Sequence, residues 1–133
     1  MGYTVELMDA GLFCRSRADA EAAASIVAAH EEMYPYHVQV SASEVRRGPD
    51  TGRWYLDIFP FEGDHWDAGA AESLWLALAP HLADGAFLEF LGEGGDRWRV
   101  RWQEGRVFEE HVAQTIWEVS KEITAESLEK EES

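Results

Sequence analysis

The sequence of 133 residues has a single cysteine, four prolines and only eleven Lys and Arg residues. One cysteine cannot form a disulfide within the chain, so we expect the hydrophobic core to hold the fold together. No apolar run approaches the roughly 20 residues of a membrane-spanning helix. The first residues also lack the basic and apolar regions of a secretory signal. These absences predict a cytoplasmic protein that does not bind membranes.

Basic residues are outnumbered by 26 Asp and Glu, which gives a formal charge of -15. A nucleic-acid-binding protein gains most of its affinity by neutralising phosphates with Lys and Arg. The composition therefore argues against direct nucleic-acid binding and favours a basic protein partner. Six Trp residues and an apolar content of 46% distinguish the chain from a disordered acidic segment.

Hydrophobic periodicity predicts several strands and two internal helices. Ser16 and Asp19 form the start signal of a helix over residues 18–33. A second helix is expected over residues 68–82, with Pro80 weakening or ending its last turn. Turns rich in Gly separate the strands. The expected strands cover residues 3–8, with a continuation over 12–15, and then 37–45, 53–59, 86–91, 97–103 and 106–112.

The C-terminal segment carries apolar residues at helical spacing. Val112, Ile116, Val119 and Ile123 are four, three and four residues apart, which predicts an amphipathic terminal helix. Residues 125–133 are expected to be an acidic, frayed tail. A single domain should therefore span residues 1–124.

The predicted order of elements is β-α-β-β-α-β-β-β-α. Its first six elements follow the order of a ferredoxin-like split β-α-β unit. We therefore expect an α+β fold with an antiparallel, ferredoxin-like sheet, extended by a C-terminal β-meander and a terminal helix. The alternative is an α+β fold with another strand order.

The meander has a defined register if its Gly-containing turns are tight hairpins. Its core face would pair Phe90 with Trp98, Leu88 with Val100 and Trp102 with Val107. Its other face would place Arg99 between Glu89 and Glu110, and Arg101 between Phe87 and Phe108. Because acidic and aromatic partners stand at these positions, we interpret Arg97, Arg99 and Arg101 as a matched sheet surface rather than a phosphate site.

Candidate chemistry is sparse in this sequence. The loop from Glu62 to Asp67 gathers three carboxylates with His65, but it lacks the ligand spacing of an EF-hand, and Asp67 can cap the following helix. No zinc, nucleophile or phosphate-loop motif is present, and Cys14 fits a buried, inert thiol. We expect no catalytic residue, no metal and no cofactor.

The sequence favours a non-enzymatic acidic binding protein whose carboxylate-rich surface docks a basic, nucleic-acid-binding protein. The sharper hypothesis is a nucleic-acid mimic that inhibits such a partner, of the phage counter-defence or antitoxin type. One alternative is a homodimeric assembly module, and another is a small metal-dependent enzyme that uses Asp64, His65 and Asp67. The predicted partner-binding residues are Glu62, Asp64, Trp66, Asp67, Glu72, Trp117, Glu118 and Glu122.

Overall fold

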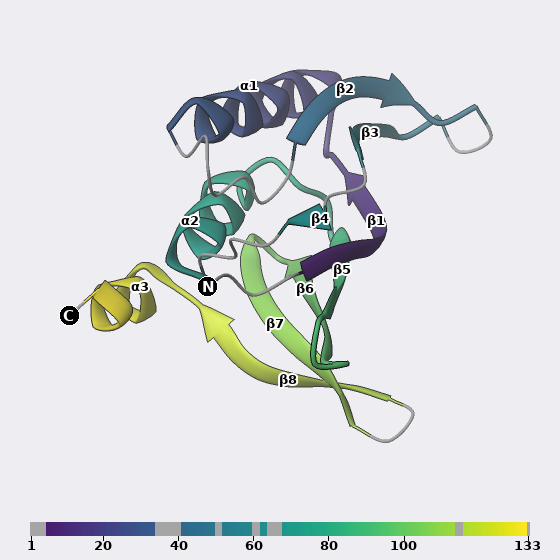
Figure 1. The fold of residues 1–133 in the computed structure, drawn as a ribbon. Helices are drawn as coiled ribbons and strands as arrows, with labels where there is room; N and C mark the ends of the chain where they lie inside the picture. Colours follow the sequence, from purple (N-terminus) through teal and green to yellow (C-terminus); the bar gives the residue numbers. More distant parts are fainter. Residues whose placement is uncertain are drawn as a thin grey trace.

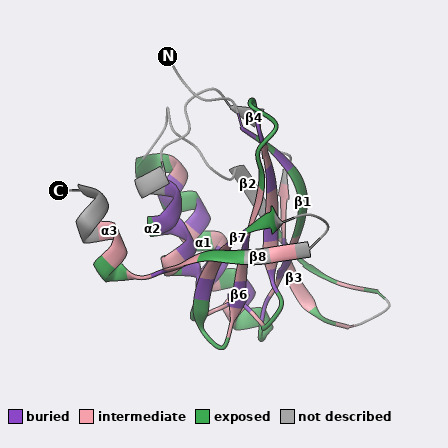
Figure 2. Ribbon diagram, turned by 90° about the horizontal axis from the view of Figure 1, so that it is seen from below, coloured by how far each residue is buried: buried purple, intermediate pink, exposed green. Residues whose placement is uncertain are grey.

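The computed structural model describes residues 5–33, 41–49, 52–59, 62–63, 68–113 and 116–132. Within these ranges, eight strands form one sheet and three helices lie on one side of it (Figure 1, Figure 2). The strands are β1 (Val5–Phe13), β2 (Ser41–Arg47), β3 (Trp54–Phe59), β4 (Glu62–Gly63), β5 (Phe87–Gly92), β6 (Arg97–Gln103), β7 (Arg106–Ala113) and β8 (Ile116–Ile123). The helices are α1 (Arg17–Met33), α2 (Ala68–Leu78) and α3 (Ala125–Glu132). The α+β class is confirmed.

Seven strands follow the order β2-β3-β1-β5-β6-β7-β8, and all neighbours on this path are antiparallel. The sheet is therefore larger than that of a simple ferredoxin-like fold. The eighth strand, β4, pairs with the N-terminal end of β1, whereas β3 pairs with the C-terminal end of β1. The sequence predicted a loop where β4 lies.

The helix boundaries follow from local chemistry. The backbone N–H of Asp19 donates to Ser16 Oγ at 3.1 Å, which confirms the predicted cap of α1. Helix α2 ends at Leu78, four residues before the predicted end. Pro80 follows in the turn, where its missing N–H costs no helical hydrogen bond.

The meander has the predicted register. Phe90 lies opposite Trp98, and Trp102 lies opposite Val107. Glu104 and Gly105 have φ angles of 53° and 72°, as a two-residue hairpin turn of type I′ requires. The expected core face is buried against α2, where Trp102 Nε1 donates to the carbonyl oxygen of Trp75 at 3.0 Å.

The predicted C-terminal helix is wrong. Residues 116–123 form strand β8, which pairs with β7 and adds an edge to the sheet. The segment is rich in Ile, Val and Trp, which favour strands, and its Ile123 is packed in the core. A helical spacing of four apolar residues was too short a pattern to decide between the two structures.

The sequence placed residues 125–133 in an acidic, frayed tail, and residues 125–132 form helix α3 in the structure. Thr124 and Ser127 cap this helix reciprocally. The backbone N–H of Ser127 donates to Thr124 Oγ1 at 3.2 Å, and that of Thr124 donates to Ser127 Oγ at 3.1 Å. This is the geometry of a capping box, with Ser in the place of the usual Glu. Helix α3 packs against α2 and so belongs to the domain.

Candidate functional site

Four of the predicted partner-binding residues lie in the acidic loop after β3. Asp64, Trp66 and Asp67 are outside the described residues, and so is His65. The backbone of Glu62 belongs to β4, where it stands opposite Glu6 of β1. The predicted role of this loop therefore remains a prediction.

Glu72 is not part of an acidic surface. It lies on α2 with 3% of its surface exposed, and it accepts a hydrogen bond from Lys121 Nζ at 2.6 Å. Its neighbours on the helix, Ala71, Leu74 and Trp75, are also buried. The sequence predicted Glu72 as a partner-binding residue, whereas in the fold its carboxylate faces Lys121 on β8.

The other three predicted residues lie on β8. Trp117 and Glu122 are both on the face of the sheet that points away from the helices, which we call the outer face. Trp117 lies over the guanidinium groups of Arg97 and Arg99, at 5.6 and 4.5 Å from the ring centre. Glu122 makes an ion pair with Arg106. Glu118 is in the same strand, opposite His111.

The outer face is organised around a buried carboxylate. Glu110 is only 5% exposed, yet it stands on a face that no described helix covers. Its Oε1 accepts hydrogen bonds from Arg99 Nε at 2.6 Å and from Arg101 Nε at 3.2 Å. Phe108 lies 5.2 Å from the Arg101 guanidinium. Each guanidinium is thus held by both a carboxylate and an aromatic ring.

Because successive side chains of a strand point to opposite faces of the sheet, the strand register shows which charged residues stand on the outer face. Its described basic residues are Arg46, Arg53, Arg97, Arg99, Arg101 and Arg106. Its described acidic residues are Glu6, Asp9, Glu44, Asp57, Glu89, Glu110 and Glu122. Six Arg therefore stand among seven carboxylates, so the predicted matched surface is confirmed. The pairing differs in one detail, because Glu89 binds Arg97 rather than Arg99.

The helical layer, which we define as α1, α2 and α3, has the opposite balance. Its nine acidic residues are Asp19, Glu21, Glu31, Glu32, Glu72, Glu126, Glu129, Glu131 and Glu132. Its two basic residues are Arg17 and Lys130. The overall composition gives only the net charge, and the fold shows how that charge divides between the two sides of the sheet.

Two titratable groups are buried on the helical side of the sheet: the thiol of Cys14 and the imidazole of His30 on α1. Burial raises the pKa of the Cys14 thiol to about 11, and the nearby Asp19 carboxylate adds to the increase. The thiol is therefore protonated near neutral pH, as an inert cysteine requires, although Arg15 is its neighbour in the sequence. Burial lowers the pKa of His30 on α1, so its imidazole is predominantly neutral.

His81 and Asp19 form a contact between α1 and the turn after α2. His81 Nδ1 and Asp19 Oδ1 are 2.9 Å apart. The hydrogen bond from His81 lowers the pKa of Asp19, and Ser16 acts in the same direction. The pair is explained by helix capping and packing. No group of three or more His, Cys, Asp or Glu residues in the described ranges could hold a metal ion.

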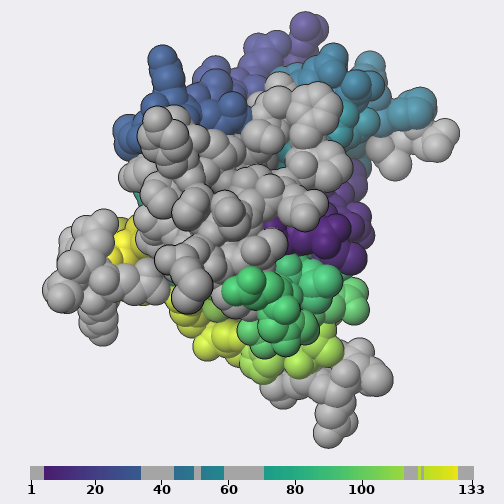
Figure 3. All heavy atoms as spheres, viewed as in Figure 1, coloured from purple at the N-terminus to yellow at the C-terminus, as the bar shows by residue number. Residues whose placement is uncertain are grey.

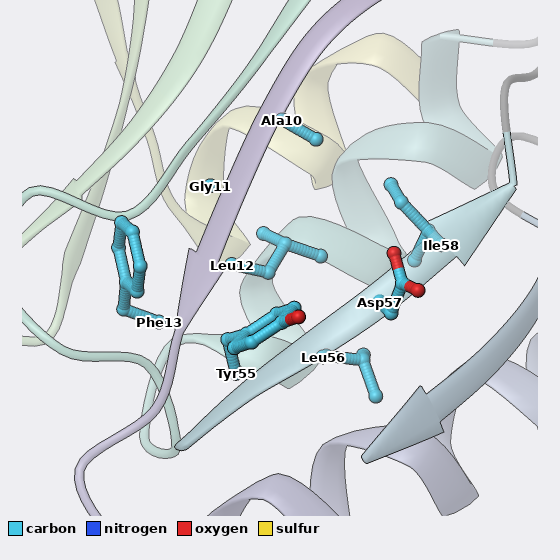
Figure 4. A pocket seen from close by; sticks show the side chains of 8 residues that line it. All are labelled: Ala10, Gly11, Leu12, Phe13, Tyr55, Leu56, Asp57 and Ile58. Carbon is cyan, nitrogen blue, oxygen red and sulfur yellow. The ribbon is translucent and has the colours of Figure 1, made fainter. Parts of the chain in front are cut away.

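A cavity of about 190 Å³ lies where β1 and β3 separate (Figure 4). Its lining residues are Ala10, Gly11, Leu12, Phe13, Tyr55, Leu56, Asp57 and Ile58. The carboxylate of Asp57, which lines this cavity, makes an ion pair with Arg46, with 2.9 Å between Asp57 Oδ2 and Arg46 Nε. Small-molecule sites are typically about 300–1,000 Å³, so this cavity is smaller than most of them.

Comparisons with known proteins leave the family open. No family model matches the chain, and no curated protein or solved structure matches it significantly. Across the described helices, none combines the length and the apolar character needed to cross a membrane.

Proposed function

We propose that the protein is a non-enzymatic binding protein that docks a basic protein partner through its helical layer and the adjoining loops. The observation that carries the proposal is the separation of charge in the fold. The described outer face holds six Arg and seven carboxylates, whereas the three helices hold nine acidic residues and two basic ones. The excess of negative charge therefore lies on the helical side of the sheet in the described ranges.

Exposed carboxylates occur on the helices and on the hairpin turns. Glu32 lies at the end of α1, Glu126 at the start of α3, and Glu93 and Glu104 in the turns of the meander; all four are exposed. A surface of this kind attracts basic proteins over distances of about a Debye length. Nucleic-acid-binding proteins are the partners that such a surface fits best, since their binding sites already accept rows of negative charge.

In the sharper form of this proposal, the protein imitates nucleic acid and competes with it for a partner. Counter-defence and antitoxin-like inhibitors would belong to this class. The residues of the 62–67 loop and Glu118 remain candidate contacts on this proposal, whereas Trp117 lies on the outer face against Arg97 and Arg99. The metal-dependent alternative rests on Asp64, His65 and Asp67 and awaits a test of stabilisation by divalent cations.

A competition experiment tests this proposal. A small basic DNA-binding protein is bound to a labelled DNA duplex, and the acidic protein is added at increasing salt. We expect it to displace the duplex at about 50 mM salt and to lose most of that effect by about 200 mM. A polyglutamate peptide of equal charge is the control. Failure to displace the duplex at every salt concentration would contradict the proposal.

The ferredoxin-like description is also a proposal. The order β2-β3-β1-β5, with α1 and α2 on one side, supports it, because the split β-α-β unit places these connections on one face of an antiparallel sheet. The meander strands β6, β7 and β8 then extend the sheet beyond that unit. An experimental structure with a different order for β1, β3 and β5 would overturn this description.

A further inference from the structure

The sheet ends at an open edge. Strand β8 is last in the sheet and pairs only with β7, so its other side has no strand beside it in the described chain. Figure 1 shows β8 along the lower rim, and Figure 3 shows its yellow-green to yellow atoms at the surface there. At the opposite edge, α1 packs against β2. Strand β2 also ends the sheet, so β8 is one of its two edges, and the backbone groups on the outer side of β8 are accessible to an added strand.

The protection that edge strands usually carry is weak on β8. Val119 is 51% exposed, and Val112 on β7, which stands opposite Trp117, is 36% exposed. Lys121, the basic residue of the strand, turns to Glu72 on α2 instead of guarding the edge. A bulge at Ser120 interrupts the ladder to β7, and its hydroxyl contacts His111. The bulge bends the strand but leaves an exposed apolar side chain next to it.

Charge decides which occupant fits this edge. Glu110 and Glu122 are already paired with Arg residues of the outer face. Apart from these two, six Glu residues stand against two Lys residues from Glu109 to the end of the chain. A second copy of the chain would bring its own charge of -15 to the same place and would be repelled. An extended segment rich in Lys and Arg would instead be attracted, and its alternate side chains could contact the apolar residues of the edge.

We propose that the partner adds an extended, basic segment as a further strand along residues 117–123 of β8. This proposal rests on the proposed function and extends the docking surface from the helical layer to the edge strand β8, which leads directly into α3. The added strand supplies backbone hydrogen bonds to β8, Val119 contacts its apolar residues, and the surrounding carboxylates attract its cations.

The test uses two synthetic peptides of eight residues with alternating Lys and Val. One is unmodified, and the other is methylated on alternate backbone nitrogens, so that charge and side chains stay the same while hydrogen-bond donors are lost. We expect the unmodified peptide to slow hydrogen exchange of the β8 amides. The methylated peptide should bind about tenfold more weakly or worse.

Two variants with the same change of charge complete the test. Val119→Lys places a cation at the edge, and Met8→Lys places one at an equally accessible position, 50% exposed, on β1. Val119→Lys should weaken binding of the unmodified peptide about tenfold, whereas Met8→Lys should weaken it less than threefold. Hydrogen exchange without peptide confirms that both variants are folded.

The outcomes separate the two proposals. Equal binding of both peptides, without protection of β8, would overturn the added strand and leave the acidic docking surface standing. Protection of β8 that rises with the concentration of the protein alone would assign the edge to a second copy and overturn the proposal. Failure of both peptides to bind at low salt would contradict the proposed function as well.

Discussion

On the outer face of the sheet, six Arg stand among seven carboxylates, whereas the helical layer carries nine acidic residues and two basic ones. The outer-face charges are fixed in place. Glu110 is buried and holds Arg99 and Arg101, and aromatic rings cover several of the guanidinium groups. On the helices, Glu32 and Glu126 are exposed.

The difference indicates two roles for charge in one small domain. On the outer face, ion pairs and aromatic contacts take the place of a covering layer of helices, so those charges serve the fold. In the helical layer, the exposed carboxylates of Glu32 and Glu126 contribute little to packing. Charges that the fold does not use are the ones available to a partner. Substitutions on the two sides should therefore have different consequences.

The largest expected effect is on the outer face. Glu110→Gln keeps the shape of the side chain and removes the charge that holds two Arg residues. Because the Arg99 and Arg101 side chains are about a quarter exposed, the cost should be about 2–3 kcal/mol, below the range for fully buried pairs. Denaturant unfolding measures it.

The matched control is Glu44→Gln on the same face, where the ion pair with Arg46 is exposed. Its effect should stay within about 0.5 kcal/mol. Equal losses in the two variants would show that the buried carboxylate has no special structural role.

The next largest effect is expected where the sheet meets the helical layer. Lys121→Met keeps the aliphatic stem but leaves the Glu72 carboxylate buried without its cation. We expect a loss of about 2 kcal/mol. Adding Glu72→Leu should restore much of that loss, since a buried pair can often be replaced by apolar residues. A double variant less stable than Lys121→Met would contradict this account.

A smaller, pH-dependent effect is expected at His30. Burial lowers the pKa of His30 in the folded state, so the unfolded chain binds more protons as the pH falls below about 6.5. Stability should then decrease between about pH 7 and pH 5, at no more than about 1.4 kcal/mol per pH unit. His30→Gln should flatten this slope. If the free energy of unfolding of the parent protein and of His30→Gln changed with pH in parallel, the role assigned to His30 would be refuted.

Asp19 affects stability in a different, more acidic pH range. Its pKa is lowered in the folded state, so the stability it contributes is present above the pKa of the unfolded chain and is lost only in more acidic solution, below about pH 4. The two groups can therefore be distinguished by the pH at which unfolding becomes easier.

The sequence predicted the meander in detail because its turns are short and chemically specific. Glu104-Gly105 requires positive φ angles, and the alternation around it leaves one register that buries Trp98, Val100 and Trp102 on a single face. Local signals also located the start of α1 at Ser16. These features depend on neighbouring residues, which sequence patterns describe well.

Features that depend on distant residues were missed. Residues 116–123 fit a helix by spacing, and only pairing with β7 makes them a strand. The burial of Glu72 depends on Lys121, which is 49 residues away in the sequence. The reciprocal cap of Thr124 and Ser127 was a local signal that could have indicated α3. The acidic loop at residues 64–67 lies outside the described residues, so its predicted role is untested.

The most direct test of the account compares two double variants of equal charge. Glu32→Lys with Glu126→Lys changes the helical layer, and Glu6→Lys with Glu44→Lys changes the outer face; all four positions are exposed, and each pair moves the formal charge from -15 to -11. Affinity for the basic DNA-binding protein should fall about tenfold for the first pair and less than threefold for the second. Equal losses would show that only net charge matters and would contradict a docking surface on the helical layer.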